Sequence, residues 1–523
     1  MNYGKYSNPT KIPQSQPIPG KNMKKNNAGG YSFTVSPWQF LTRFLILGTE
    51  GGSYYLSEQK LTLGALSNLQ HCIQEDGVRV VNEIVQISDE GRAVKNDPAI
   101  FALAAAVKLG NDDARKAAYA ALPKVCRIGT HLFTFAEALK DLQKGWGRGL
   151  KTAVSKWYLD KSADKLAYQV VKYQQRNGWS NRDLLRLSHP ISKDATLNAV
   201  FKWIVDGTVS EELPKVIEGF ELAKKATSAK QIIKLINDYD LPREAIPTTY
   251  LNDATVWAAL LPKMPYTALM RNLGNLSKHN LLKPLSSESK MVIDKLTNED
   301  NIKAARVHPI SILIAMKQYA SGRGLKGSGS WSADPNVTSA LEDAFYKAFK
   351  YIEPTNLNYL LGIDISGSMS YSRNGVLTAA ECAAAIAMSI VKSEKHTYTM
   401  GFSTNFIHLG INKNQSLKNV LKTTTNRTFG GTDCALPMEY ALQNKLDVDV
   451  FIVITDNETW AGNIHPSEAL KQYNKAMNKK AKLIVLATDA TSFTIAEPGN
   501  PLMLDIAGFD ASVPAAIAEF AKM

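Results

Sequence analysis

Side chains suited to metal binding stand where two apolar runs end in the last third of the chain. The runs span residues 358–365 and 448–455, and a glycine-rich loop lies between them. The candidate ligands are Asp364, Ser366, Ser368, Thr432 and Asp456. Carboxylate and hydroxyl oxygens are hard ligands, and one or two carboxylates with several waters is the coordination that Mg2+ prefers. The pattern therefore predicts a Mg2+ site with an open coordination position.

Catalysis is an alternative use of the same acidic residues. An aspartyl phosphotransferase needs a second acid two residues after its nucleophile, where this chain has Ser366. A metal nuclease needs a cluster of carboxylates. The candidates for such a cluster are Asp364, Asp433, Asp456 and Glu458. No GxSxG motif, Walker loop or GxGxxG motif after a strand is present, so we expect a binding protein with no catalytic residues.

A basic group of candidates begins on the helix predicted between residues 162 and 175. Leu166, Val170 and Tyr173 follow one helical stripe, which predicts a face that packs inward. The cations of this helix, seven and four residues apart on an adjacent row, are Lys165, Lys172 and Arg176. Lysine and arginine on an exposed row suit phosphate groups, whereas the plainer alternative is a solvated basic face.

The next predicted helix extends this basic surface. Ser180 is a good N-cap with Asp183 at the third helical position, and Pro190 ends the helix. Its candidate nucleic-acid contacts are Arg182, Arg186 and the terminal His189. A histidine in this position can stack on a base or donate to a phosphate. The two helices together favour a surface that binds the phosphates of a nucleic acid.

Charge and length divide the chain into unlike parts. The 523 residues are too many for one ordinary core, and the net charge is +13. Residues 1–352 carry 47 basic and 32 acidic side chains, whereas residues 353–523 carry 14 and 16. A basic excess confined to the first two-thirds suggests a polyanionic partner, nucleic acid first, although scattered lysines that serve solubility would give the same sum.

Periodicity assigns a fold to each part. Residues 1–34, rich in Asn, Lys, Pro and Gly, predict a mobile or extended tail. Residues 35–353 show helical spacing throughout and predict an α-solenoid of stacked HEAT-like helix pairs. In residues 354–523, apolar runs at 358–365, 397–402, 448–454 and 482–487 alternate with helical patterns, which predicts a parallel, doubly wound α/β sheet.

Several absences complete the sequence picture. The four cysteines are far apart and the eight histidines form no metal-binding cluster, which argues against disulfides and a zinc site. No run is long and apolar enough for a membrane span, and the start lacks an apolar leader. We therefore expect a cytoplasmic protein without membrane contact.

The strand-end pattern D-x-S-x-S, then Thr, then Asp, resembles the metal-ion-dependent adhesion site of von Willebrand factor A domains. Longer segments extend the resemblance over nearly the whole chain after the tail. They are RFLILGTEGGSYY (43–55), RIGTHLFTF (127–135), KYQQRNGWSNRDLLRLSHP (172–190), MPYTALMRNLGN (264–275), RVHP (306–309), GGTDCALP (430–437) and TDNETWAG (455–462). Together they resemble the sixty-kilodalton Ro autoantigen family, which joins a TROVE module to a von Willebrand A domain.

This resemblance implies a ring of helical repeats closed by the A domain. It implies binding of small noncoding Y RNA on the outer basic surface and of single-stranded ends of misfolded RNA in a central hole. The family's Y RNA contacts fall on Lys172, Arg176 and His189, and its adhesion-site ligands fall on the metal candidates named above. Asn181 departs from the family, where many relatives have a basic residue or histidine.

Partners follow from the same resemblance. Bacterial relatives tether an exoribonuclease, polynucleotide phosphorylase, through a Y RNA, and that enzyme is a candidate partner of this chain, which we expect to be monomeric. The competing hypothesis is a metal-dependent protein-interaction scaffold of the von Willebrand A type, without direct RNA function.

Overall fold

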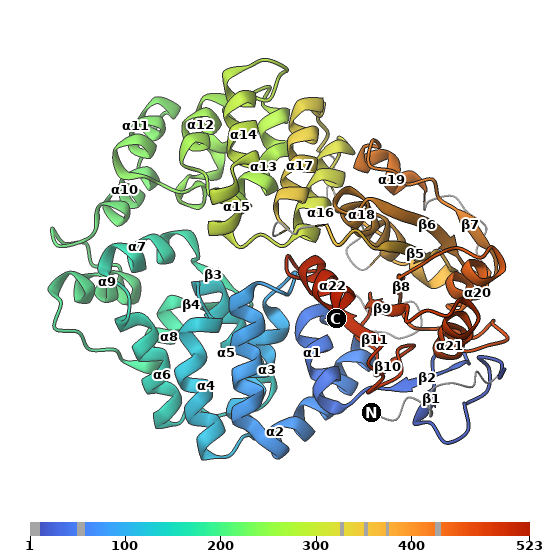
Figure 1. Cartoon of the computed structure of the whole chain (residues 1–523). Helices are drawn as coiled ribbons and strands as arrows, with labels where there is room; N and C mark the ends of the chain where they lie inside the picture. Colours follow the sequence, from blue (N-terminus) through green and yellow to red (C-terminus); the bar gives the residue numbers. More distant parts are fainter. Residues whose placement is uncertain (1–10, 50–57, 325–328, 350–353, 373–375, 424–429) are drawn as a thin grey trace.

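The computed structural model describes residues 11–49, 58–324, 329–349, 354–372, 376–423 and 430–523. Residues 1–10 of the predicted tail, 50–55 of the first family segment and the predicted domain boundary at 353 lie outside these ranges. A long helical region is followed by an α/β domain, as the sequence predicts (Figure 1). None of the described helices combines the length and apolar character that a membrane span needs.

The helical region stacks its helices in sequence. They are α1 (Pro37–Leu47), α2 (Glu58–Glu90), α3 (Asp97–Leu109), α4 (Asp112–Val125), α5 (Gly129–Asp141), α6 (Arg148–Leu159), α7 (Ala163–Lys172), α8 (Asn181–Ser188), α9 (Ala195–Asp206), α10 (Lys215–Lys224), α11 (Ala229–Tyr239), α12 (Ala254–Leu260), α13 (Tyr266–Lys278), α14 (Ser287–Thr297), α15 (Glu299–Ala305), α16 (Pro309–Ala320) and α17 (Pro335–Lys347). Helices two apart along the chain pack on each other, as α2 does on α4, α3 on α5 and α4 on α6. Each helix thus packs on helices that are close to it along the chain, which is the arrangement of an α-solenoid.

The α/β domain contains a six-stranded sheet in the order β11-β9-β8-β5-β6-β7. Its strands are β5 (Asn358–Asp364), β6 (His396–Phe402), β7 (Phe406–His408), β8 (Val450–Thr455), β9 (Lys482–Ala487) and β11 (Met503–Ala507). All neighbours are parallel except β6 and β7. The predicted parallel, doubly wound sheet is therefore confirmed, with an antiparallel strand added at one edge. Only three residues separate β6 from β7, and so short a link permits only a hairpin.

Helices cover both faces of this sheet. They are α18 (Ala379–Ser393), α19 (Leu417–Thr423), α20 (Leu436–Gln443), α21 (Pro466–Met477) and α22 (Val513–Lys522). Leu361 and Ile363 of β5 face the core shared with α18 and α22, whereas Leu360 faces the core shared with α20 and α21. Alternate strand residues thus feed opposite cores, which is the doubly wound arrangement.

Residues 11–34 form an extended segment on the α/β domain. Within it, β1 (Met23–Lys25) and β2 (Tyr31–Thr34) pair with each other, and β2 pairs with β10 (Phe493–Thr494). All three strands are antiparallel. The segment therefore joins a second, small sheet with a strand that lies 459 positions further along the chain.

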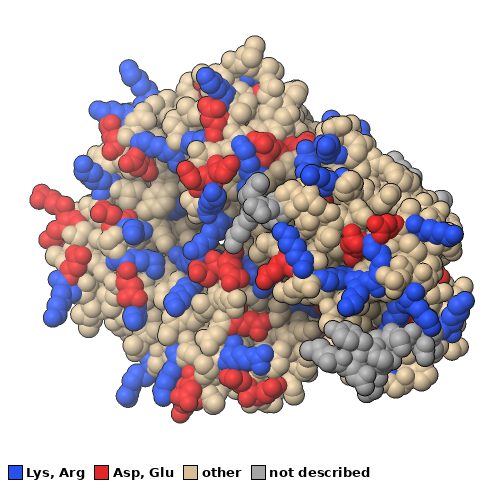
Figure 2. Space-filling model, viewed as in Figure 1, with Lys and Arg blue, Asp and Glu red and all other residues tan. Residues whose placement is uncertain are grey.

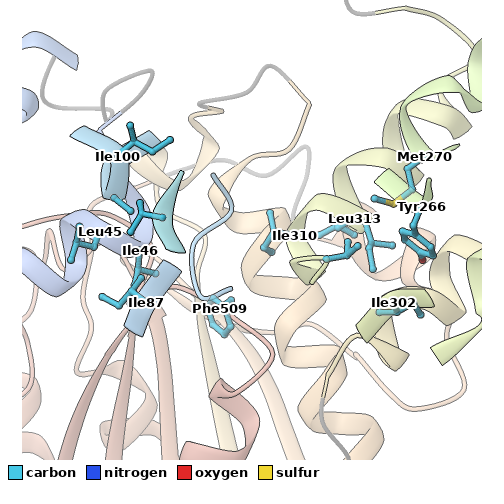
Figure 3. Close-up of a cluster of buried hydrophobic side chains, with 14 of the residues drawn as sticks. Leu45, Ile46, Ile87, Ile100, Tyr266, Met270, Ile302, Ile310, Leu313 and Phe509 are labelled. Carbon is cyan, nitrogen blue, oxygen red and sulfur yellow. The ribbon is translucent and has the colours of Figure 1, made fainter. Parts of the chain in front are cut away.

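Both ends of the helical region contact the α/β domain. In α1 the buried guanidinium of Arg43 donates to both carboxylate oxygens of Asp505 at 2.7 and 2.6 Å. In α16, Lys317 pairs with the buried Glu381 of α18. Figure 3 shows buried side chains from α1, α2 and α3 on one side and from α13, α15 and α16 on the other, with Phe509 of the α/β domain between them. One continuous core therefore joins the two parts of the protein.

Candidate functional site

The predicted metal ligands lie buried at the carboxyl edge of the sheet. They are Asp364 at the end of β5, Ser366 and Ser368 in the following turn, Asp456 after β8, and Thr432 in the loop before α20. The strands β5 and β8 are parallel neighbours with Ile363 opposite Ile454, so the residues that follow them meet at one edge. The Thr432 carbonyl accepts from the Trp460 amide at 2.9 Å. This bond joins the loop that contains Thr432 to the loop that follows Asp456, so Thr432 lies at the same edge.

Hydrogen bonds fix the oxygens of the first turn. The Ser366 amide donates to Asp364 Oδ1 at 2.9 Å, and the Thr455 hydroxyl donates to Asp364 Oδ2 at 2.6 Å. The hydroxyls of Ser366 and Ser368 lie 3.2 Å apart. The turn thus presents one carboxylate and two hydroxyl oxygens in a fixed arrangement, as the D-x-S-x-S spacing predicts.

The electrostatics of the edge favour a cation. Burial raises the pKa of Asp364 to about 6, and burial together with the charges of Asp364 and Glu458 raises the pKa of Asp456 well above its usual range. Among the described residues, no lysine or arginine forms an ion pair with Asp364 or Asp456. Two buried carboxylates without a cationic partner are costly, and a divalent ion would remove that cost.

The donor set also matches the expected metal. Within the described ranges no three His, Cys, Asp or Glu side chains converge on one point, so a nuclease-type carboxylate cluster is not formed there. Two carboxylates with three hydroxyls are hard oxygen ligands and fit Mg2+ better than a softer metal. The residues present therefore fit the predicted ion.

The other two acids of the region are engaged by the N-terminal segment. Asp433 Oδ1 accepts from the Gln14 side-chain amide at 2.7 Å. Glu458 accepts from the Asn27 side chain at 2.5 Å and from the Ala28 amide at 3.0 Å. Nothing in the sequence pattern indicated these contacts, because the partners are more than 400 positions apart.

The basic surface differs from its prediction at Arg176, which lies outside the helix, and at Lys172, which is half-buried and not exposed. Helix α7 ends at Lys172, and Arg176 lies in β3 (Gln175–Arg176), which pairs with β4 (Trp179–Ser180). The prediction that Arg176 continues the helical row of Lys165 and Lys172 is therefore wrong. The reason is the Asn177-Gly178 turn, whose φ values of 52° and 75° are those of a type I′ hairpin.

The cations of this surface have unequal environments. Lys165, Arg176, Arg182, Arg186 and His189 are exposed. Lys172 is half-buried, with its ammonium 5.4 and 5.5 Å from the ring centres of Tyr168 and Tyr173, and burial lowers its pKa. Arg176 lies 3.9 Å from Asp97, a contact too long and exposed to neutralise it. The arginine side chains and Lys165 thus remain available to solvent.

Helix α8 begins as predicted. Ser180 and Asp183 form a capping box, and the Ser180 hydroxyl accepts from the Asp183 amide at 3.4 Å. His189 ends the helix with a left-handed backbone, φ 47°. Asn181, where the family pattern is broken, is buried: it accepts from the Tyr158 hydroxyl and donates to the Tyr173 carbonyl, both at 3.0 Å. It therefore links the start of α8 to α6 and to the end of α7.

Two glycine-containing segments pack closely on aromatic rings. The segment 271–275 lies inside α13, where a Cβ on Gly274 would meet the Trp331 ring at 2.8 Å. In segment 145–149, a Cβ on Gly149 would meet the Tyr119 ring at 2.8 Å. Both glycines therefore permit close packing.

The fold and the site define a helical-repeat protein that carries an α/β domain of the von Willebrand A type. Comparison with family models is specific: the Ro60 vWA domain matches residues 358–521, and the TROVE domain matches residues 24–241 and 228–318. The chain belongs to the Ro60 family of TROVE and von Willebrand A proteins.

Individual relatives agree with this assignment. "RNA-binding protein RO60" of Deinococcus radiodurans is 42% identical, with 98% of each chain covered. The protein of the same name from Caenorhabditis elegans is 34% identical, over 95% of this chain and 89% of its own length. The crystal structure of the Deinococcus radiodurans RO (RSR) protein superposes with a TM-score of 0.72 at 41% identity, covering 93% of this chain and 99% of that one.

Proposed function

We propose that this protein binds RNA, with structured Y RNA on its outer basic surface and single-stranded ends of misfolded RNA in a central opening. The observation that carries the proposal is the set of exposed arginines on the β3–β4 hairpin and α8, namely Arg176, Arg182 and Arg186, with the exposed His189 at the end of α8. Arginine on a rigid element binds phosphate oxygens with two donors at once. The names of the relatives from Deinococcus radiodurans and Caenorhabditis elegans support this use.

A central opening is supported by the contacts of the helical region. Its two ends bind the same domain, and Arg306 of one end donates to Asp89 of the other at 2.7 Å. The face in Figure 2 is hollowed near its centre, where Lys and Arg side chains lie beside acidic ones. We propose a closed ring whose hole admits a single strand.

The experiment compares two RNA classes. Lys172→Ala with Arg176→Ala should weaken binding of a structured small RNA by at least tenfold and leave single-strand binding within about twofold, since two phosphate contacts are lost at the outer surface only. The matched control is Lys230→Ala with Lys234→Ala, which removes two exposed lysines four residues apart on α11. Equal loss for both RNA classes, or equal loss in the control, would contradict the assigned surface.

We further propose that Asp364, Ser366, Ser368, Thr432 and Asp456 hold Mg2+. When bound, the ion supplies positive charge and an open coordination position for an acidic group of a partner. The protein's own residues would orient the ligand oxygens, and the hydrogen bonds to Asp364 support this for the first of them. The role is binding, and no residue is assigned a catalytic one.

The partners and place of action complete the proposal. We propose that the protein acts in the cytoplasm as a monomer and that bound RNA can tether an exoribonuclease such as polynucleotide phosphorylase. Purification with and without ribonuclease treatment tests this: nucleic acid and the exoribonuclease should both be lost after treatment. A partner that stays bound without RNA and leaves with chelator would instead favour the metal-dependent protein scaffold.

A further inference from the structure

The N-terminal segment runs past the carboxyl edge of the sheet, directly on the loop that follows Asp456. A Cβ on Gly30 would lie 2.0 Å from the Thr459 carbonyl oxygen. The Asn26 side chain donates to the same carbonyl at 2.7 Å, and the Ser32 hydroxyl donates to the Asn457 carbonyl at 3.1 Å. The segment therefore contacts the backbone of residues 457 and 459, in the loop that follows the candidate ligand Asp456.

Gln14 is the most deeply set residue of this segment. It is 0% exposed, and every polar group that it has is used. Its backbone amide donates to the Gly462 carbonyl at 2.9 Å, and its carbonyl accepts from the Tyr31 amide at 2.8 Å. Its side-chain NH2 donates to Asp433 Oδ1 and to the Ile464 carbonyl, both at 2.7 Å, and its side-chain oxygen accepts from the Thr459 hydroxyl. A fully satisfied buried amide fixes the groups around it.

The partners of Gln14 belong to two different ligand loops. Asp433 directly follows Thr432, and Thr459 lies three residues after Asp456. Without Gln14, these loops are joined by the Cys434 amide on the Thr459 hydroxyl at 3.2 Å and by the amides of 460 and 461 on the Thr432 carbonyl at 2.9 and 3.0 Å. The Thr459 hydroxyl also lies 3.3 Å from the Thr432 carbonyl. The Gln14 side chain adds a bridge to these direct links, because it bonds to Asp433 in one loop and to Thr459 in the other.

We propose that Gln14 is a positioning residue of the metal site: it holds the Thr432 loop against the Asp456 loop so that both face Asp364. This inference rests on the proposed Mg2+ site. It assigns the N-terminal segment a part in metal binding, although none of its residues is a ligand. Its other anchors, such as Lys21 on Glu497 and Lys24 on Ser492, lie outside the ligand loops.

The test uses the full-length protein and Mg2+ alone as the probe, in calorimetric titrations. Gln14→Ala should raise the Mg2+ dissociation constant at least tenfold. Gln14→Met should do the same, because it keeps the volume and loses the hydrogen bonds. Lys21→Ala, which removes an anchor of the same segment away from the ligand loops, should leave the constant within about twofold.

Hydrogen exchange in chelator supplies a readout that does not depend on the metal. The amides of Trp460 and Ala461, which donate to the Thr432 carbonyl, should exchange faster in Gln14→Ala and Gln14→Met than in the wild type and Lys21→Ala. If Gln14→Ala does not fold, the proposal is tested by the Mg2+ affinity and hydrogen exchange of Gln14→Met alone.

Three results would overturn the proposal. Wild-type Mg2+ affinity in Gln14→Met would show that the link has no effect on the site. An equal loss of affinity in Lys21→Ala would show that the segment acts only through general stability. If the wild type itself does not bind Mg2+, both the proposed metal site and the role of Gln14 are refuted. This result is obtained before any variant is measured, so it is distinguished from a failure of Gln14 alone.

Discussion

Asp364 is the side chain whose loss should separate the metal site from the RNA surface most cleanly. Asp364→Ala removes the proposed charged ligand at the end of β5, so Mg2+ should no longer stabilise the protein. At about 100 times the dissociation constant, the lost stabilisation is about 2.7 kcal/mol. Thermal unfolding with Mg2+ and with chelator measures it, with Glu519→Ala on α22 as an exposed acidic control.

The RNA arm of this experiment gives the opposite expectation. RNA affinity should be unchanged in Asp364→Ala, because Lys172, Arg176 and His189 belong to the helical region. A variant that still gains stability from Mg2+ would refute the assigned ligand. Complete loss of RNA affinity in a folded variant would show that the two sites are coupled.

Gly462 shows how closely the ligand loop is packed. A Cβ at this position would lie 2.3 Å from Asp433 Oδ1 and 2.3 Å from the Gln14 side-chain nitrogen. We therefore expect Gly462→Ala to reduce the free energy of unfolding by about 1–3 kcal/mol, the usual cost of overpacking. Denaturant unfolding measures it, and Gly145→Ala, which meets no atom within 4 Å, is the control. Wild-type stability in Gly462→Ala would contradict the tight packing of this loop.

Single residues also show which parts of the candidate site could be predicted from the sequence. Asp364, Ser366 and Ser368 are visible because their spacing is local and follows a recognisable strand. Gln14 is not visible, since it bonds to Asp433 across 419 positions and glutamine in a Pro-rich segment carries no signal of burial. Local patterns indicate candidate ligands, whereas the residues that would position them depend on tertiary contacts.

At the scale of elements, the β3–β4 hairpin determines where Arg176 lies. Gly178 has φ 75° with no atom within 4 Å of an added Cβ, so only backbone strain opposes a side chain there. Gly178→Val should weaken structured RNA binding several-fold, because a branched residue in this region costs about 1–2 kcal/mol. Gly178→Asn should bind nearly as the wild type, since asparagine tolerates this conformation. Equal binding by all three proteins, measured by filter titration, would contradict a role for the turn.

The same hairpin explains why the helical prediction failed at Arg176. The apolar stripe correctly assigned Leu166 and Val170 to the buried face of α7, but a stripe says little about where a helix ends. The Asn-Gly pair was the available signal for a turn. Similarly, the fully buried strand β8 was apparent as a continuous apolar run, whereas β7, three residues at a sheet edge, has no pattern to detect.

At the scale of the whole molecule, Arg43 is the main polar link between the first helix and the α/β domain. Besides Asp505, its guanidinium donates to the carbonyls of Thr491 and Phe493 at 2.8 and 2.7 Å. Arg43→Ala leaves a carboxylate and two carbonyls without their partner, so we expect a loss of about 3–5 kcal/mol in unfolding free energy. The exposed Arg79→Ala should cost far less. Denaturant unfolding measures the free energy lost in each variant. Similar losses would show that the contact between α1 and the α/β domain does not depend on Arg43.

The charge distribution gives the last expectation, for RNA binding as a whole. The basic excess lies in residues 1–352, and the proposed contacts are lysine and arginine on phosphate. Neutralising phosphates releases counterions, so log affinity should fall linearly with log salt by roughly 0.7 per contact on a single strand. With about 5 to 8 contacts the slope should lie between about −3.5 and −5.6.

Titrations of the wild type from low to moderate salt measure this slope. Lys172→Ala with Arg176→Ala should make it shallower for a structured RNA by about two contacts, because each lost cation is one phosphate no longer neutralised. The control Lys230→Ala with Lys234→Ala should keep the wild-type slope. An affinity that does not change with salt would mean that the recognition is not made by the exposed cations, and the basic excess would then serve solubility.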